Sequence, residues 1–231
     1  MQAITDEEFG TITLRRSARA THVRIRVTPD GRLRASLPLY APIFMVKRLI
    51  RSSREQLRQL LADHHPELTF TNGMQIGKSH TLIIRYSATS VSKSERHGQQ
   101  IIITLPNDSL LHSPANTRVI RDAIIAALRL EAKSYLTKRL AYLAKHGAYS
   151  YSKVRFSHAS GRWGSCSSSG TISLNIALMK LPFELIDYVL VHELSHTVEM
   201  NHSEAFWRLV ETADPQYKTH RGALKKETPS I

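Results

Sequence analysis

The sequence predicts a mixed α+β protein, and three observations support this prediction. Short stretches typical of strands occur at residues 23–27 and 32–37, where apolar and polar residues alternate, and at residues 81–86 and 100–105. Longer stretches with apolar residues every three or four positions, typical of helices, occupy residues 117–146 and 183–200. The second of these helices carries the pattern H-E-x-x-H at residues 192–196.

The H-E-x-x-H pattern predicts a catalytic metal site. His192 and His196 lie four residues apart, so on a helix they project from one face. Two imidazoles in this arrangement can hold one Zn²⁺, and Glu193 beside them can act as general base on a metal-bound water. His202 follows after a predicted turn and is the expected third ligand. Three protein ligands leave the fourth position that a catalytic zinc site needs. The alternative is an exposed helix whose two histidines bind no metal.

The surrounding sequence supports a helix at this position. An apolar stripe recurs at every fourth residue, and the two histidines point roughly 200° away from it at about 100° per residue. The stripe consists of Ile186, Leu190, Leu194 and Val198. Pro182 is expected near the helix start and Met200-Asn201 near its end, and Ser203 is expected to cap a following helix.

Several motifs resemble the YgjP-like metallopeptidase-domain family, which belongs to the zincin-like metallopeptidases and is related to the SprT-like proteins. They are the run Arg162-Trp163-Gly164-Ser165-Cys166, then Asn175, and the residues around the H-E-x-x-H pattern. The resemblance is dense over residues 151–224 and looser towards the N-terminus. It implies a zincin-like α+β domain in which His192, His196 and His202 hold the metal and Glu193 is the catalytic acid/base. It also implies that the helix at 117–146 packs behind a sheet and beside the metal-site helix.

Composition limits the class of protein. A chain of 231 residues with 42% hydrophobic residues can bury a full core. Apolar runs stay well short of the roughly 20 residues that span a bilayer, and the N-terminal residues do not resemble a signal peptide. A single cysteine, Cys166, excludes an internal disulfide. These features favour a cytoplasmic protein without a transmembrane segment.

Positive charge is concentrated near the N-terminus. The net charge is +13, and residues 15–58 contain 12 basic residues against 2 acidic ones. A predicted hairpin around residues 29–31 places the side chains of Arg24, Arg26, Arg32 and Arg34 on one face. Such a surface attracts nucleic acid, nucleotides or acidic membranes. The alternative is a solvated basic face without a dedicated partner.

The remaining elements predict two portions. Residues 1–115 form a β-rich, basic portion with one helix, which runs from Pro42 to about His64-His65-Pro66. Residues 1–10 are expected to be a loose terminus and residues 87–99 an exposed loop. Residues 116–231 form the zincin-like catalytic portion, which begins with a long helix capped by Asn116. Strands at residues 153–156 and 171–176 flank a loop at residues 157–170.

That loop contains the candidate substrate-binding residues. Arg162 could hold a carboxylate, a phosphate or a developing oxyanion, and Trp163 could form the floor of a pocket. Equally, Trp163 could pack in the core and Arg162 could form a structural ion pair. One flanking strand, with the loop, is the candidate rim that pairs with an extended substrate. Cys166 could be an additional metal ligand, but three histidines already fill the site and a buried structural cysteine is expected. Tyr217 either donates to a tetrahedral intermediate or packs.

The leading functional interpretation is a zinc-dependent peptidase that acts on peptides or unfolded protein, with Glu193 as general base. Two alternatives stay open. The first is a metal-dependent nucleoside triphosphate (UTP-type) pyrophosphatase, an activity that the resemblance suggests and that the basic face would suit. The second is a nucleic-acid-associated protease like the SprT-like relatives.

Overall fold

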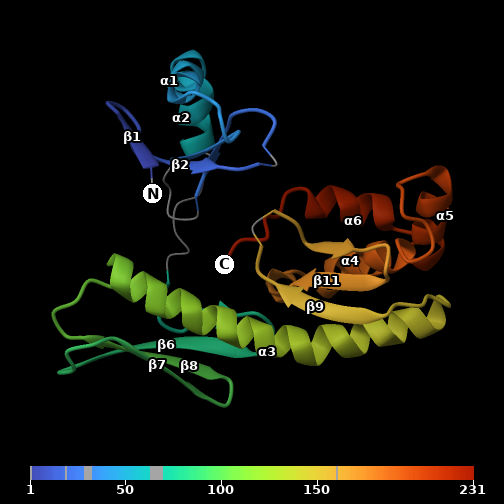
Figure 1. The fold of residues 1–231 in the computed structure, drawn as a ribbon. Helices are drawn as coiled ribbons and strands as arrows, with labels where there is room; N and C mark the ends of the chain where they lie inside the picture. Colours follow the sequence, from blue (N-terminus) through green and yellow to red (C-terminus); the bar gives the residue numbers. More distant parts are fainter. Residues whose placement is uncertain (1, 19, 29–32, 63–69, 160) are drawn as a thin grey trace. The chain divides into compact units, whose positions relative to one another are not determined.

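The computed structural model describes residues 2–18, 20–28, 33–62, 70–159 and 161–231. The chain divides into two compact units, residues 1–69 and residues 70–231 (Figure 1). The division expected at residue 115 lies inside the second unit, in the first turn of α3 (Pro114–His146), the helix that follows β8 (Gln100–Pro106). These two elements pack against each other, so the strands before residue 115 share a core with the long helix.

The first unit is a four-stranded sheet with two helices. The strands β1 (Gln2–Asp6), β2 (Gly10–Arg16), β3 (Arg24–Val27) and β4 (Leu33–Leu37) lie in the order β1-β2-β4-β3. The core joins β2 and β4 to the buried faces of the helices α1 (Ile43–Ser52) and α2 (Arg54–Ala62). The expectation of a loose N-terminus was wrong, because residues 2–6 pair with β2 along their whole length. β1 buries little side-chain surface, so its sequence carries no clear alternation.

The predicted single helix after Pro42 is two helices. α1 ends at Ser52, and the backbone N–H of Ser53 bonds back to the carbonyls of Leu49 and Ile50. α2 then begins at Arg54. The histidines expected at the helix end, His64 and His65, lie outside the described residues, as does the turn at residues 29–31.

The predicted arginine face is present on the described part of the hairpin. Arg26 lies directly opposite Arg34 in the antiparallel register of β3 and β4, and both side chains are exposed. On β4, the exposed Arg34 lies between two buried residues, Leu33 and Ala35, and Leu37 is buried as well. Arg32 lies outside the described residues. Contact of this face with a polyanion stays a prediction.

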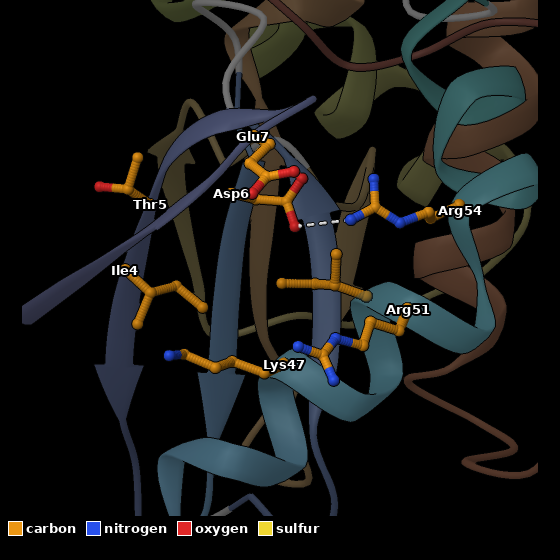
Figure 2. A pocket seen from close by; sticks show the side chains of 8 residues that line it. Ile4, Thr5, Asp6, Glu7, Lys47, Arg51 and Arg54 are labelled. Carbon is orange, nitrogen blue, oxygen red and sulfur yellow. Dashed lines mark hydrogen bonds and ion pairs between the residues drawn. The ribbon is translucent and has the colours of Figure 1, made fainter.

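Acidic residues from β1 and the turn after it neutralise part of the basic segment. Asp6 pairs with Arg54 at 3.1 Å across a pocket of about 280 Å³ between β1 and α1 (Figure 2). Glu8 pairs with both Arg54 and Arg58. Lys47 and Arg51 also line this pocket from α1 (Figure 2). The free positive charge of the segment is therefore smaller than a count over residues 15–58 suggests.

The second unit begins with a mixed sheet. The strands β5 (Gln75–Ile76), β6 (His80–Ser87), β7 (Lys93–His97) and β8 lie in the order β5-β6-β8-β7, with β6 parallel to β8. The loop expected at residues 87–99 was wrong, because β7 pairs with β8 in that stretch. All five β7 side chains are exposed, so backbone pairing forms the strand without an apolar face.

The long helix α3 connects the two halves of this unit. Its 33 residues span about 50 Å and run along the sheet of β6 to β8 and on past β9 (Figure 1). Ser113, rather than Asn116, caps the helix by accepting the N–H of Asn116. Asn116 is instead buried, and its side-chain amide donates to the Leu110 carbonyl at 2.8 Å. Gly147 follows the last turn, as the sequence predicts.

A buried carboxylate fixes α3 to the first sheet. Glu131 is 7% exposed and accepts the backbone N–H groups of Lys78 and Ser79 at 2.7 and 2.9 Å. His80 Nδ1 lies 2.6 Å from the same carboxylate. Burial alone would raise the pKa of Glu131, but the hydrogen bonds from Lys78, His80 and Ser79 outweigh it and hold the pKa below its usual value.

The C-terminal half carries a small sheet and three helices. The strands β9 (Lys153–Ser157), β10 (Gly164–Cys166) and β11 (Thr171–Asn175) lie in the order β10-β11-β9. The 3₁₀ helix η1 (Ile176–Lys180) leads into α4 (Phe183–Ser195), α5 (Glu204–Ala213) and α6 (Tyr217–Leu224). β10 lies within the stretch expected to be a loop. Within the described residues, no helix is long and apolar enough to cross a membrane.

α4 is buried around most of its surface. It contacts α3, α5, α6 and β10, and a bidentate ion pair between Arg139 and Asp187, at 2.8 and 2.7 Å, joins it to α3. The helix ends at Ser195, five residues before the predicted end. Val198, expected in the buried stripe, lies past the helix and is 62% exposed.

Candidate metal centre

Three imidazoles converge at the C-terminal end of α4. Each of His192, His196 and His202 offers a ring nitrogen, and these atoms all lie within 4.8 Å of one another. His192 Nε2 and His202 Nε2 are 3.2 Å apart. Tetrahedral zinc with Zn–N bonds of about 2.0–2.1 Å requires ligand nitrogens roughly 3.3–3.4 Å apart. The spacing of this pair therefore fits a tetrahedral metal ion.

Local backbone structure brings the third histidine back to the first two. His192 lies in the last turn of α4, and His196 is the C-cap residue that directly follows the helix. The N–H groups of Thr197 and Glu199 bond back to the carbonyls of Leu194 and Ser195, which turns the chain sharply. Ser203 then caps α5 by accepting the N–H of Phe206 at 3.3 Å, as the sequence predicts. His202 directly precedes this cap.

The histidines are held in the form that binds metals. His196 Nδ1 donates to the carbonyl of Glu199 at 3.1 Å, which leaves the lone pair of Nε2 free. Burial lowers the pKa of His192 to about 3, and its neighbours His196 and His202 contribute. Burial also lowers the pKa of His196. Both rings are therefore neutral at pH 7, and neutral imidazole is the ligating form.

Two aromatic residues of α5 form the wall behind the imidazoles. Phe206 is fully buried, and its ring centroid lies 5.0, 4.5 and 4.8 Å from those of His192, His196 and His202. Trp207 stacks on His202 at 5.7 Å, with Tyr217 stacked on it in turn at 5.5 Å. Tyr217 is 8% exposed, and this stacking places it in the packed wall.

Glu193 lies beside the triad with one oxygen unsatisfied. The residue is 5% exposed, and its Oε2 is buried without a hydrogen-bond partner among the described residues. Burial raises the pKa of this carboxyl group to about 8, although the positive charge of Arg162 opposes the shift. A buried carboxyl group with a perturbed pKa in such a cluster is typical of a functional site.

The other residues predicted in the loop fall into different settings. Arg162 is exposed, and its charge acts on Glu193. Trp163 is half-buried, and its role as a pocket floor stays a prediction. Cys166 is also half-buried, and burial followed by the charge of Glu193 raises the pKa of its thiol. Among the described residues, the group of side chains arranged to hold a metal consists of the three histidines and does not include Cys166.

Two supporting residues were not identified from the sequence as parts of the site. A Cβ atom at Gly164 would lie 2.5 Å from Glu193 Oε1, so only glycine leaves room for this carboxylate. Asn175 is 1% exposed, and its side-chain amide donates to the carbonyls of Ala159 and Arg162 at 2.7 and 2.9 Å. It thereby fixes the loop that carries Arg162. The family motif contains both residues, and this was the only signal for them.

Comparison with known proteins gives one family profile and one solved structure. The family profile described as "YgjP-like, metallopeptidase domain" matches residues 21–227. One solved structure that matches is the crystal structure of the metallopeptidase zymogen of Pyrococcus abyssi abylysin. It is 29% identical over 39% of this chain and 92% of that chain, with a TM-score of 0.36. A search of curated proteins finds no match. Because the family profile covers most of the sequence, the chain belongs to the YgjP-like family of metallopeptidase domains.

Proposed function

We propose that this chain is a zinc-dependent peptidase that hydrolyses peptides or unfolded protein, with Glu193 as its general base. The observation that carries the proposal is the unpartnered Oε2 of Glu193 beside the three converging imidazoles. An unpartnered buried carboxylate oxygen is costly unless a ligand or water engages it. The three imidazole nitrogens suit zinc better than Mg²⁺, which prefers oxygen ligands.

The three histidines and Glu193 have different roles in the proposed reaction. His192, His196 and His202 would hold Zn²⁺, which when bound supplies a Lewis acid that polarises a carbonyl group and acidifies a coordinated water. Glu193 takes a proton from the attacking water at Oε2 and later donates it to the leaving amine. Burial raises the pKa of this carboxyl group, and the carboxylate is therefore a stronger base towards the attacking water.

The edge strand β10 supports an extended peptide as the substrate. Trp163 O accepts the N–H of Asn175, and Ser167 N–H donates to Thr171 O, so the residues that bond to β11 alternate along the strand. The main-chain groups of Gly164 and Cys166 therefore point towards the opposite edge. In the described residues, no strand pairs with that edge. A peptide can add there as a further strand, directly beside Glu193.

Nucleotide pyrophosphohydrolysis is the weaker proposal. In a Mg²⁺-dependent enzyme of that kind, clustered carboxylates would be expected to hold the ion. Across the described residues, the His192, His196 and His202 triad is the only group of three or more potential ligands arranged to hold a metal. The same triad and Glu193 suit attack on a peptide carbonyl.

Substitution of Glu193 by Gln tests the proposal, because Gln keeps the shape and removes the basicity. Glu193→Gln should bind zinc and fold like the wild type, while hydrolysis of denatured casein falls by at least the roughly 10²–10⁴-fold that general acid–base catalysis contributes. Unchanged casein hydrolysis would refute the mechanism. Parallel assays on UTP separate the alternatives, since UTP hydrolysis that survives in Glu193→Gln must use another site.

A further inference from the structure

A cavity of about 300 Å³ lies against the metal centre on the side of His196. Three segments line it: residues 150–152 before β9, residues 167–170 between β10 and β11, and the chain after α4 at His196, Thr197 and Met200. Its size is at the lower end of the range for ligand pockets. It is not needed to explain metal binding or the role of Glu193.

The cavity lies along the path of a peptide paired with β10. Gly164 is adjacent to Glu193, and β10 ends at Cys166. Ser167, the next residue, lines the cavity. Three residues of extended strand cover about 10 Å. Antiparallel pairing is the more stable kind, and in it the substrate runs in the direction opposite to β10. The substrate residues that precede the cleaved bond then lie towards Ser167.

The lining is rich in hydroxyl groups and carries no acidic residue, lysine or arginine. Five serines and Thr197 contribute hydroxyl groups, and Tyr151 and Met200 contribute apolar surface. The hydroxyls of Ser152 and Thr197 already donate to backbone carbonyls, each at 2.7 Å. Within the described part of the chain, those of Ser150 and Ser168 have no hydrogen-bond partner. They remain available to a ligand.

We propose that this hydroxyl-lined cavity is a specificity pocket for an uncharged polar side chain (Ser, Thr, Asn or Gln) from a substrate residue that precedes the cleaved bond. This inference rests on the proposed peptidase function. A charged side chain would gain no partner of opposite charge there, because the lining holds no acidic residue, lysine or arginine. A hydroxyl or amide group replaces its water with the free hydroxyls of Ser150 and Ser168.

The first test is the cleavage profile of a proteome-derived peptide library, read by mass spectrometry. The wild type should enrich Ser, Thr, Asn and Gln at least fivefold at one of the three positions before the cleaved bond. Ser168→Asp places a carboxylate in the cavity and should shift that position towards Lys and Arg. Ser90→Asp, at an exposed serine between β6 and β7, is the matched control and should keep the wild-type profile.

The second test does not depend on cleavage. Zinc-loaded Glu193→Gln protein is immobilised, and the peptides that it retains from the same library are sequenced. They should be rich in the four uncharged polar residues, and Glu193→Gln combined with Ser168→Asp should retain basic peptides instead. The specificity-pocket proposal is overturned if the wild type shows no residue preference at the three positions before the cleaved bond. It is also overturned if Ser168→Asp leaves the cleavage profile unchanged. Selective retention by Glu193→Gln, together with no cleavage of the library by the zinc-loaded wild type, supports the pocket and refutes the proposed peptidase function.

Discussion

The backbone of Gly164 lies directly against the carboxylate of Glu193. A Cβ atom at residue 164 would come within 2.5 Å of Oε1 and 2.7 Å of Cγ of that side chain. Gly164 belongs to the edge strand and Glu193 to the metal-site helix, so this contact fixes the distance between the two elements of the proposed site.

Gly164→Ala should therefore displace the Glu193 carboxylate or push β10 away from α4. Misplacement of a reacting group by about 1 Å can cost roughly 10²-fold in rate. Casein hydrolysis should fall by about that factor while zinc content stays at the wild-type level. Gly161→Ala is the matched control, because a Cβ atom there meets nothing within 4 Å. Equal activity in the two variants would show that the contact does not position the carboxylate.

His202→Ala should weaken zinc binding by more than 100-fold. Loss of residues that merely orient ligands already costs about 10–100-fold, and His202 contributes a ligand nitrogen itself. Competition with a fluorescent chelator measures the affinity. Cys166→Ala should keep full affinity, because Cys166 is not part of the described group of side chains arranged to hold a metal. Dialysis against a chelator should abolish wild-type hydrolysis and added Zn²⁺ restore it. Wild-type affinity in His202→Ala would remove His202 from the site.

Glu131 should make the stability of the second unit sensitive to acid. Its pKa in the folded chain lies below the model-peptide value of 4.5, so its contribution is fully present above pH 4.5 and is lost as the pH falls through the folded-state pKa. Glu131→Gln should lower the free energy of unfolding at pH 7 by about 1–3 kcal/mol. Its deficit relative to the wild type should shrink below pH 4.5.

Urea unfolding followed by tryptophan fluorescence measures this effect, because both tryptophans, Trp163 and Trp207, lie in the second unit. Asp122→Asn, on an exposed part of the same helix, is the control and should behave like the wild type. A deficit of Glu131→Gln that stays constant from pH 7 to pH 3 would contradict the assignment.

The sequence predicts that the three histidines converge, because their geometry is local. His192 and His196 share a helix face, and His202 follows within one turn. The contact of Gly164 with Glu193 could not be predicted in this way. It joins residues far apart in the chain, and it depends on how closely a strand approaches a helix.

The strands that the sequence misses share a physical cause. β1, β7 and β10 bury few side chains, and their backbone pairing with a neighbouring strand leaves no periodic signal. The end of α4 was predicted near Met200, whereas the helix ends at Ser195, and the cause is again the apolar pattern. Val198 continues the apolar spacing, but the chain has already turned towards His202. The charge of residues 15–58 was overestimated because Asp6 and Glu8, which pair with Arg54 and Arg58, lie outside that segment.

The last prediction concerns Asn175, which holds the loop that carries Arg162. Its amide donates to two loop carbonyls, and its Oδ1 accepts the N–H of Ala177 at 3.0 Å. Asn175→Ala removes all three hydrogen bonds, and a typical hydrogen bond contributes about 0.5–1.5 kcal/mol to stability. Asn175→Asp keeps the acceptor for Ala177 and removes both donations to the loop.

The loop itself supplies the measurement, because trypsin cuts after exposed arginines and Arg162 is exposed. Both Asn175→Ala and Asn175→Asp should be cut after Arg162 faster than the wild type. Asn175→Asp should lose less stability, because the bond to Ala177 at the start of η1 survives. Asn72→Ala removes a comparable bond, to the N–H of Ile84, at a distant and exposed position, and it should leave the rate of this cut unchanged. If cutting after Arg162 accelerates equally in Asn72→Ala, general destabilisation is the cause and Asn175 does not fix the loop.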